Sequence, residues 1–157
     1  MKVLISDHLS DSAISIFKNK GIDVDYLPDL SRERLKKIIH NYDALAIRSN
    51  TNVDKEILLL SSNLKVIGRA GIGVDNIDID SATSKGIIVM NTPHGNSITT
   101  AEHTIAMIMS LARQIPDANV STKNGKWEKS KFVGTEITGK KLGLIGCGNI
   151  GSIVVDR

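Results

Sequence analysis

The sequence predicts an α/β fold, in which a doubly wound parallel sheet is followed by the start of a second α/β unit. Over about the first ninety residues, short β-branched runs alternate with helical segments, which is the pattern of a parallel sheet covered by helices. A turn-rich stretch interrupts this alternation at residues 91–96. Near the end of the chain, a glycine-rich turn lies between an apolar run and a helical segment, which predicts the beginning of another unit.

Five strands and four helices account for the first unit. We expect strands at residues 2–6, 23–26, 44–47, 65–68 and 87–90, and helices at residues 11–20, 32–41, 55–61 and 80–85. Gly21 and Gly86 follow two of these helices, where a helix C-terminus favours glycine. Ligands of open parallel sheets bind beyond the carboxyl ends of the strands, so the loops at that edge are the first candidates for a site.

A domain boundary is expected at residues 91–96, where Pro93 forces the residue before it towards extended geometry. This divides the chain into residues 1–96 and residues 97–157. After the boundary, Thr99-Thr100-Ala101-Glu102 has the pattern of a capping box, which predicts the start of a helix. Apolar residues then continue at helical spacing up to Pro116, namely Ala101, Ile105, Ile108, Met109 and Ala112.

Residues 117–138 are polar and contain Gly125, Trp127 and Gly134, so we expect an extended arm and not a core element. A lone tryptophan in such an arm is typical of an anchor into a partner subunit. The arm therefore favours contact with a partner subunit, and the full-length protein is expected to be a homodimer or a tetramer.

Composition excludes several classes of function. Of the 157 residues, 41% are apolar and 24% charged, which is typical of a globular protein and unlike a disordered chain. The 20 basic and 17 acidic residues are interspersed, so no nucleic-acid partner is expected. No apolar run reaches the roughly 18–20 residues of a membrane span. The single Cys147 allows no internal disulfide, no metal site is expected, and a reducing cytoplasm fits these features.

The motif that carries chemistry lies near the C-terminus. A predicted strand at residues 141–145 leads into Gly146-Cys147-Gly148-Asn149-Ile150-Gly151, and a helical segment follows. In a Rossmann turn of the form G-x-G-x-x-G, the first glycine permits the tight turn, the second lets a pyrophosphate approach, and the third allows close helix packing. A helix N-terminus also offers free N–H groups to phosphate. The expected cofactor-binding residues are Gly146, Gly148, Asn149, Ile150 and Gly151.

By itself, the glycine motif leaves a simple turn as an equal alternative. The acidic residue that would hold a ribose is expected about 20 residues after the motif, beyond Arg157. The strand at residues 141–145 has no parallel neighbour in its own unit, and a helix this short is marginal in water. We therefore expect this tail to be frayed or paired with another chain.

Four segments resemble, in order and spacing, the NAD-dependent D-2-hydroxyacid dehydrogenase family: Ile47-Arg48-Ser49, residues 69–78 (RAGIGVDNID), Met90-Asn91-Thr92-Pro93 and the glycine motif. Residues 111–116 (LARQIP) and 125–128 (GKWE) narrow the resemblance to the D-3-phosphoglycerate dehydrogenases. The resemblance implies a flavodoxin-like substrate domain, followed by the truncated start of a Rossmann domain that binds NAD. It also implies a reaction in serine biosynthesis, the oxidation of 3-phosphoglycerate to 3-phosphohydroxypyruvate with formation of NADH.

The resemblance also implies substrate-binding residues at the carboxyl edge of the sheet. Arg48 and Ser49 follow the third strand, where a guanidinium can clamp a phosphate or a carboxylate. The alternative for Arg48 is an ion pair with a surface acid. Ile72 and Gly73 match a pair whose backbone amides hold the substrate carboxylate. The alternative there is that Gly71 and Gly73 are simple turn glycines.

Two further substrate-binding residues are implied later in the chain. Asn96 matches a family asparagine at the cleft, and capping of the following helix is an equally good use of this residue. Lys129 matches a basic residue that the family contributes to the neighbouring subunit's substrate. Relatives carry Arg at that position, and a lysine keeps the charge but loses the paired hydrogen bonds.

The family's catalytic Arg, Glu and His follow the glycine motif, so none is assigned here and residues 1–157 alone are expected to be inactive. Three alternatives stay open. The chain can belong to a non-catalytic NAD-binding regulatory module, as in corepressors resembling this family. It can belong to another 2-hydroxyacid dehydrogenase, such as a glyoxylate or hydroxypyruvate reductase. It can also be an interaction fragment that uses the long helix and the arm for dimerisation.

Overall fold

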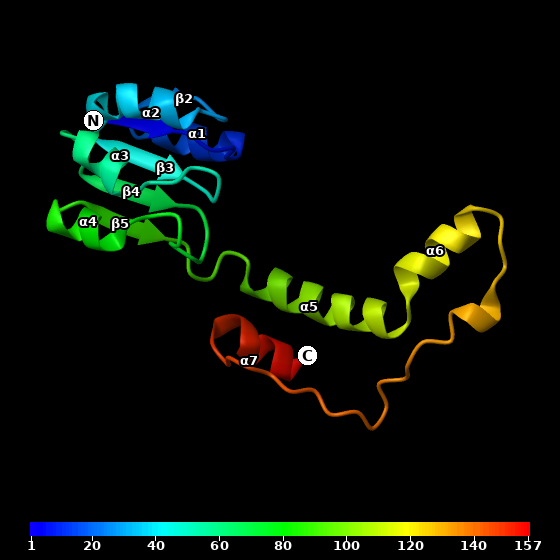
Figure 1. The fold of residues 1–157 in the computed structure, drawn as a ribbon. Coiled ribbons are helices and arrows are strands. Elements are labelled where there is room, and N and C mark those ends of the chain that lie inside the picture. Colours follow the sequence, from blue (N-terminus) through cyan, green and yellow to red (C-terminus); the bar gives the residue numbers. More distant parts are fainter. The chain divides into compact units, whose positions relative to one another are not determined.

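The computed structural model describes residues 1–157, which form two compact units, Met1–Gly95 and Asn96–Arg157. Figure 1 shows the elements of each unit along the chain. The division falls within the turn-rich stretch that follows the last strand of the first unit.

The first unit is a five-stranded parallel sheet flanked by helices, and it confirms the predicted α/β fold class. The strands are β1 (Lys2–Ile5), β2 (Asp23–Tyr26), β3 (Ala44–Ile47), β4 (Val66–Arg69) and β5 (Ile88–Asn91), in the order β2-β1-β3-β4-β5. The helices are α1 (Asp11–Asn19), α2 (Arg32–Ile38) continued by the 3-10 helix η1 (Ile39–Asn41), α3 (Lys55–Leu60) and α4 (Ile79–Ser84). All nine predicted elements are present, and apart from the 3-10 end of the second helix their bounds shift by one residue at most.

Two apolar clusters cover the two faces of this sheet, because successive side chains of a strand point to opposite faces. The larger cluster contains Leu45 of β3 and packs against α2, α3 and α4. The smaller one contains Ile5 of β1 and packs against Phe17 of α1. The face with α1 is covered only in part, since Ile88 and Met90 on β5 are 62% and 55% exposed.

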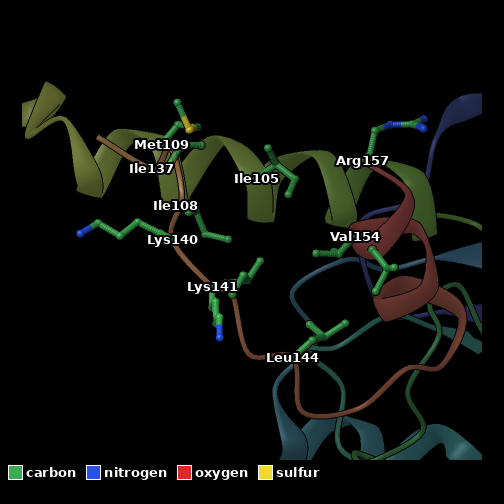
Figure 2. Close-up of a pocket in the computed structure, with 11 residues that line it drawn as sticks. Ile105, Ile108, Met109, Ile137, Lys140, Lys141, Leu144, Val154 and Arg157 are labelled. Atoms are coloured by element: carbon green, nitrogen blue, oxygen red, sulfur yellow. The ribbon is translucent and has the colours of Figure 1, made fainter. Parts of the chain in front are cut away.

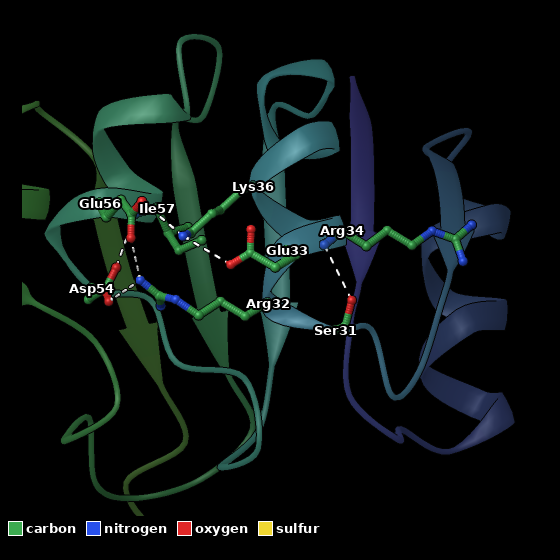
Figure 3. Close-up of polar contacts among 8 residues, drawn as sticks. All are labelled: Ser31, Arg32, Glu33, Arg34, Lys36, Asp54, Glu56 and Ile57. Atoms are coloured by element: carbon green, nitrogen blue, oxygen red, sulfur yellow. Dashed lines mark hydrogen bonds and ion pairs between the residues drawn. The ribbon is translucent and has the colours of Figure 1, made fainter.

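A network of ion pairs joins α2 to the start of α3 (Figure 3). The Arg32 guanidinium lies 2.7 Å from Asp54 Oδ2 and 2.7 Å from Glu56 Oε2. Lys36 Nζ lies 2.9 Å from Glu56 Oε1 and 3.1 Å from Glu33 Oε1. The two cations, Lys36 foremost, lower the pKa of Glu56. Because these carboxylates are largely exposed, the network contributes modestly to stability and mainly fixes how the two helices meet.

The second unit contains the helices α5 (Ser97–Ala112), α6 (Ile115–Lys123) and α7 (Asn149–Asp156) and a short 3-10 helix, η2 (Lys129–Lys131). Figure 1 shows α7 lying alongside α5, and the two helices form the main packing contact of this unit. None of the helices of the chain combines the length and the apolar character that crossing a bilayer requires.

Two predictions for this unit are wrong in part. The capping box at residues 99–102 does not start the helix, because α5 begins at Ser97 and the amide of Thr100 already donates to the carbonyl of Asn96 at 2.9 Å. The arm at residues 117–138 is not extended throughout, since residues 117–123 lie within α6. Pro116 explains this difference, because proline favours the first turn of a helix even where the following residues are polar.

The strand predicted at residues 141–145 does not form. These residues are exposed, and Ile145 is fully exposed, at 104% of the reference value. A strand is stable only when its backbone groups pair with a neighbour, and the second unit contains no other strand. Residues 141–145 therefore have the apolar sequence of a strand, but no neighbouring strand with which to pair.

Candidate functional site

A polar pocket lies at the carboxyl edge of the sheet, beyond β1 and β3. It has a volume of about 260 Å³ and is lined by Asp7, His8, Arg48, Ser49 and Asn50. β1 and β3 are neighbours in the sheet, which is why the loops that follow them meet. Its polar and charged walls suit a small polar or anionic ligand. The structure thus places Arg48 and Ser49, both exposed, at one pocket.

The Arg48 guanidinium forms no ion pair with an acidic residue of the chain. The structure therefore gives no support to the alternative that Arg48 forms a surface salt bridge. His8, in the same pocket, lies 2.8 Å from Asp29 through its Nε2 atom. Asp29 is one of two non-glycine residues with a positive φ, 62°. Arg48 is therefore the cation of this pocket that is free to meet an anion.

The turn after β4 presents free amides at the same edge. The N–H groups of Ile72 and Gly73 donate no hydrogen bond within the chain, whereas the carbonyl groups of residues 71–73 are all occupied. Adjacent free amides are a favourable arrangement for an anion. The donors to the three carbonyls are, in order, the amide of Thr92 at 3.0 Å, Asn91 Nδ2 at 2.7 Å and the Arg69 guanidinium.

The glycines of this turn are not required by backbone conformation. Neither Gly71 nor Gly73 has a positive φ. A Cβ at Gly71 would lie 2.9 Å from Arg69 Nη1, and one at Gly73 would lie 2.7 Å from Asp75 Oδ1, and both atoms end flexible side chains. A positive φ therefore does not account for these glycines, whereas the close approach of the Arg69 and Asp75 side chains does favour a residue without a Cβ.

The glycine motif of the second unit leads into α7, and the reason for a glycine differs at each of its three glycine positions. Gly146 has a φ of 94°, a conformation that favours glycine. Gly148 is the N-cap of α7, and a Cβ there would meet nothing within 4 Å. A Cβ at Gly151 would lie 2.2 Å from the carbonyl oxygen of Gly146. Asn149 and Ile150 are the first residues of α7, so their amides belong to the helix N-terminus, where no side chain caps them.

Asn96 and Lys129 both belong to the second unit. Asn96 occupies the N-cap position of α5, but its side chain makes no capping hydrogen bond. The side-chain amide is therefore not used by the helix, which weakens the alternative of a purely capping role. Lys129 is exposed and starts η2, next to the equally exposed Trp127 segment.

An apolar groove of about 500 Å³ lies between α5, α7 and residues 137–144 of the second unit (Figure 2). Ile105, Ile108 and Leu144 lie on its walls, and the Lys140 side chain extends away from this apolar group. No acidic side chain lines the groove. Its walls are mainly apolar, and the basic residues Lys140, Lys141 and Arg157 complete the lining.

Three polar residues of the sheet edge were not found from the sequence. Asp7, Arg69 and Asn76 lie behind the exposed loops and hold their backbone. Asp7 follows the first predicted strand directly, but the sequence alone does not show which groups its carboxylate contacts. The partners of Asp7 and Asn76 lie in the loop after β3 and depend on which strands are neighbours, which the local sequence does not show. The partner of Arg69 is Gly73, four residues further along the chain.

A family model described as the catalytic domain of D-isomer specific 2-hydroxyacid dehydrogenases matches residues 3–154. The chain belongs to this family. The family predicted from the four sequence segments is thereby confirmed.

Curated relatives and solved structures are similar to this protein over the whole chain. The D-3-phosphoglycerate dehydrogenase of Archaeoglobus fulgidus is 48% identical over 157 residues, which are 100% of this chain and 30% of the relative. The solved NAD+-bound 3-phosphoglycerate dehydrogenase of Entamoeba histolytica is 31% identical with a TM-score of 0.79, over 99% of this chain and 49% of that one. The TT0316 protein of Thermus thermophilus is 28% identical with a TM-score of 0.91, over 100% of this chain and 52% of that one. The chain therefore spans less than a third of the curated relative and about half of the solved chains.

Proposed function

We propose that this chain is the N-terminal part of an NAD-dependent D-3-phosphoglycerate dehydrogenase, which oxidises 3-phosphoglycerate to 3-phosphohydroxypyruvate in serine biosynthesis. In this proposal residues 1–96 are the flavodoxin-like substrate domain. Residues 97–157 supply the interdomain helix, the dimerisation arm and the first part of the Rossmann domain that binds NAD.

The observation that carries the proposal is the pair of free amides at Ile72 and Gly73, next in the sheet to the loop of Arg48. Ile47 and Arg69, the last residues of β3 and β4, are register partners, so both loops leave the sheet at the same level. Two free N–H groups suit a carboxylate, and a guanidinium without an acidic partner suits a second anionic group. A substrate with a carboxylate and a phosphate matches both features.

The geometry of the glycine motif supports NAD as the cofactor. Space is open where a side chain at Gly148 would stand, and α7 presents uncapped amides from Asn149 onward, which together fit a pyrophosphate. When bound, NAD supplies the hydride acceptor. The contribution of this segment is to receive the pyrophosphate, whereas Arg48 and the turn amides orient the substrate.

Self-association of the complete protein is part of the proposal. Trp127 is 83% exposed and Val133 70%, on the same arm of the second unit. Large apolar side chains of this kind favour burial against another subunit. We propose a homodimer or tetramer in which Lys129 of one subunit serves the substrate of its partner.

The test is a chimera in which residues 1–157 replace the corresponding segment of the Archaeoglobus fulgidus dehydrogenase. Formation of NADH from 3-phosphoglycerate is expected from the chimera and not from residues 1–157 alone. Turnover of another 2-hydroxyacid in preference to 3-phosphoglycerate would refute the substrate assignment, and turnover by residues 1–157 alone would refute the proposed inactivity of the segment.

Arg48→Ala in the chimera tests the site itself. Loss of a charge-assisted contact predicts a rise in KM for 3-phosphoglycerate of about 10-fold to 100-fold. The matched control is Arg34→Ala, which removes an exposed arginine of α2 that has no ion pair. Equal KM values for the two variants would contradict the role of Arg48.

A further inference from the structure

Asp7 is a buried carboxylate two residues after the end of β1, and only 3% of its surface is exposed. Its three hydrogen-bond donors all come from the loop that follows β3. The Arg48 amide donates to Oδ2 at 2.5 Å, the Thr51 amide donates to the same atom at 3.2 Å, and Thr51 Oγ1 donates to Oδ1 at 2.8 Å. A buried charge is costly unless it is paired in this way, so these contacts are strongly favoured over their absence.

Asn76 holds the same loop from its other side. Its Nδ2 atom donates to the carbonyl of Arg48 at 2.8 Å and to the carbonyl of Thr51 at 2.6 Å. The amides and the carbonyls at both ends of the loop are therefore fixed, by Asp7 and Asn76 respectively. Ser49 and Asn50, between these ends, form no such bonds and remain exposed at the pocket.

We propose that Asp7 is a positioning residue, which sets the backbone of residues 48–51 so that Arg48 and Ser49 meet an anionic ligand. This inference rests on the proposed function, because the role of Arg48 in binding substrate belongs to it. Asp7 does not bind the anion itself, since a carboxylate cannot donate to an anion and both of its oxygens are already used by the loop. It acts through the backbone of Arg48.

Asp7→Ala and Asp7→Asn separate this role from general stability. Alanine removes all three acceptor contacts. In Asp7→Asn the side-chain oxygen can still accept from the two amides, while its NH₂ group faces Thr51 Oγ1, so the loop keeps its geometry without the charge. The matched control is Asp43→Ala. Asp43 also accepts a hydrogen bond from a backbone amide 41 residues away, that of Lys2 at 2.8 Å. Asp43 precedes β3, however, so this bond does not hold the loop that follows β3.

The experiment uses the ¹⁵N-labelled 157-residue chain and measures amide hydrogen exchange without ligand. We expect exchange at Arg48 and Thr51 to be about tenfold faster or more in Asp7→Ala, to return towards the wild-type rate in Asp7→Asn, and to be unchanged in Asp43→Ala. The Arg48 amide proton, which faces a carboxylate, should also move upfield in Asp7→Asn, a signature that a uniform loss of stability does not produce. If Asp7→Ala does not fold, the Asp7→Asn proton shift decides.

Wild-type exchange rates at Arg48 and Thr51 in Asp7→Ala, or equal acceleration by Asp43→Ala, would overturn the inference. Titration with 3-phosphoglycerate then tests the link to binding, through the amide signals of Ser49, Asn50, Ile72 and Gly73. We expect about tenfold weaker binding in Asp7→Ala than in Asp43→Ala. If the wild-type chain shows no response to 3-phosphoglycerate, the substrate assignment fails, while the exchange data still decide whether Asp7 positions the loop.

Discussion

Replacing Gly151 by alanine is expected to displace α7 from the glycine turn. A Cβ at this position would lie 2.2 Å from the carbonyl oxygen of Gly146 and 3.1 Å from its carbon, and both are backbone atoms that cannot rotate away. Relief requires a shift of roughly 1 Å, since non-bonded heavy atoms rest at about 3.5 Å. Overpacking of this kind costs about 1–3 kcal/mol, whereas alanine gains only about 1 kcal/mol over glycine in helix propensity. The steric cost at its upper end therefore exceeds the gain in helix propensity by about 2 kcal/mol.

The readout is the amide signals and hydrogen exchange of residues 152–156 in the labelled chain. Ser152 donates its amide to the carbonyl of Gly148 at 2.9 Å, so its exchange reports the first turn of α7. Gly143→Ala is the control, because its φ is not positive and a Cβ there meets nothing within 4 Å. An unchanged or slower exchange at Ser152 in Gly151→Ala would show that the helix tolerates the methyl group, and the steric argument would be wrong.

Three other substitutions have defined outcomes. Gly148→Ala should leave the fold intact, since a Cβ meets nothing within 4 Å, and lower the NAD affinity of the chimera by about tenfold or more in calorimetry, because the methyl group occupies the pyrophosphate approach. Lys36 lowers the pKa of Glu56, so the ion pair stabilises the fold above the ordinary value of 4.5 and is lost as pH falls through the lowered pKa. The stability difference between wild type and Glu56→Gln in urea unfolding should therefore shrink in acid. Burial and the bond to Asp25 raise the pKa of Tyr42 to about 12, so stability should fall as pH rises from 10 towards 12. Tyr42→Phe should make this fall smaller and cost about 1 kcal/mol at neutral pH, while Lys2 and Lys36, whose pKa values are also raised, keep part of the dependence.

Each of these outcomes has a clear opposite. Loss of the native amide spectrum in Gly148→Ala would show that the glycine is needed for folding and not for ligand approach. A stability difference for Glu56→Gln that grows in acid would reverse the assigned direction of the pKa shift. An unfolding free energy that stays level between pH 10 and 12 in the wild type would show that the Tyr42 hydroxyl ionises without opposition from its surroundings.

The first unit was predictable because most of its strands are short apolar runs that alternate with helical segments, β2 (Asp23–Tyr26, DVDY) being the polar exception. The run at residues 141–145 has a similar local composition, yet Leu144 is 41% exposed and no strand forms. The difference is non-local, because β1 pairs with both β2 and β3, whereas the second unit offers nothing to pair with. Local pattern predicts where a strand can form, and the presence of a neighbour decides whether it does.

The same distinction applies to the site. Arg48 was identifiable because an arginine after a predicted strand, within a segment that resembles the family, points to an anion. Asp7 was not, since its partners lie 41 and 44 residues away and are reached only because β1 and β3 are adjacent. Likewise the start of α5 at Ser97 could not be read from the capping pattern two residues later. The sequence alone therefore indicates Arg48 as a candidate for ligand binding, but it does not indicate the residue that holds the Arg48 backbone in place.

Both candidate anion sites rely on backbone amides and not on side-chain donors alone. At the turn after β4 the amides of Ile72 and Gly73 donate no hydrogen bond within the chain, and at the start of α7 the first amides are free because a helix start has no preceding turn. An amide keeps its charge distribution at any pH and cannot rotate away from its place in the fold. The side chain of Ile72 is therefore secondary to its N–H group. This explains how an apolar residue can lie at the centre of an anion site, where composition alone would not place it.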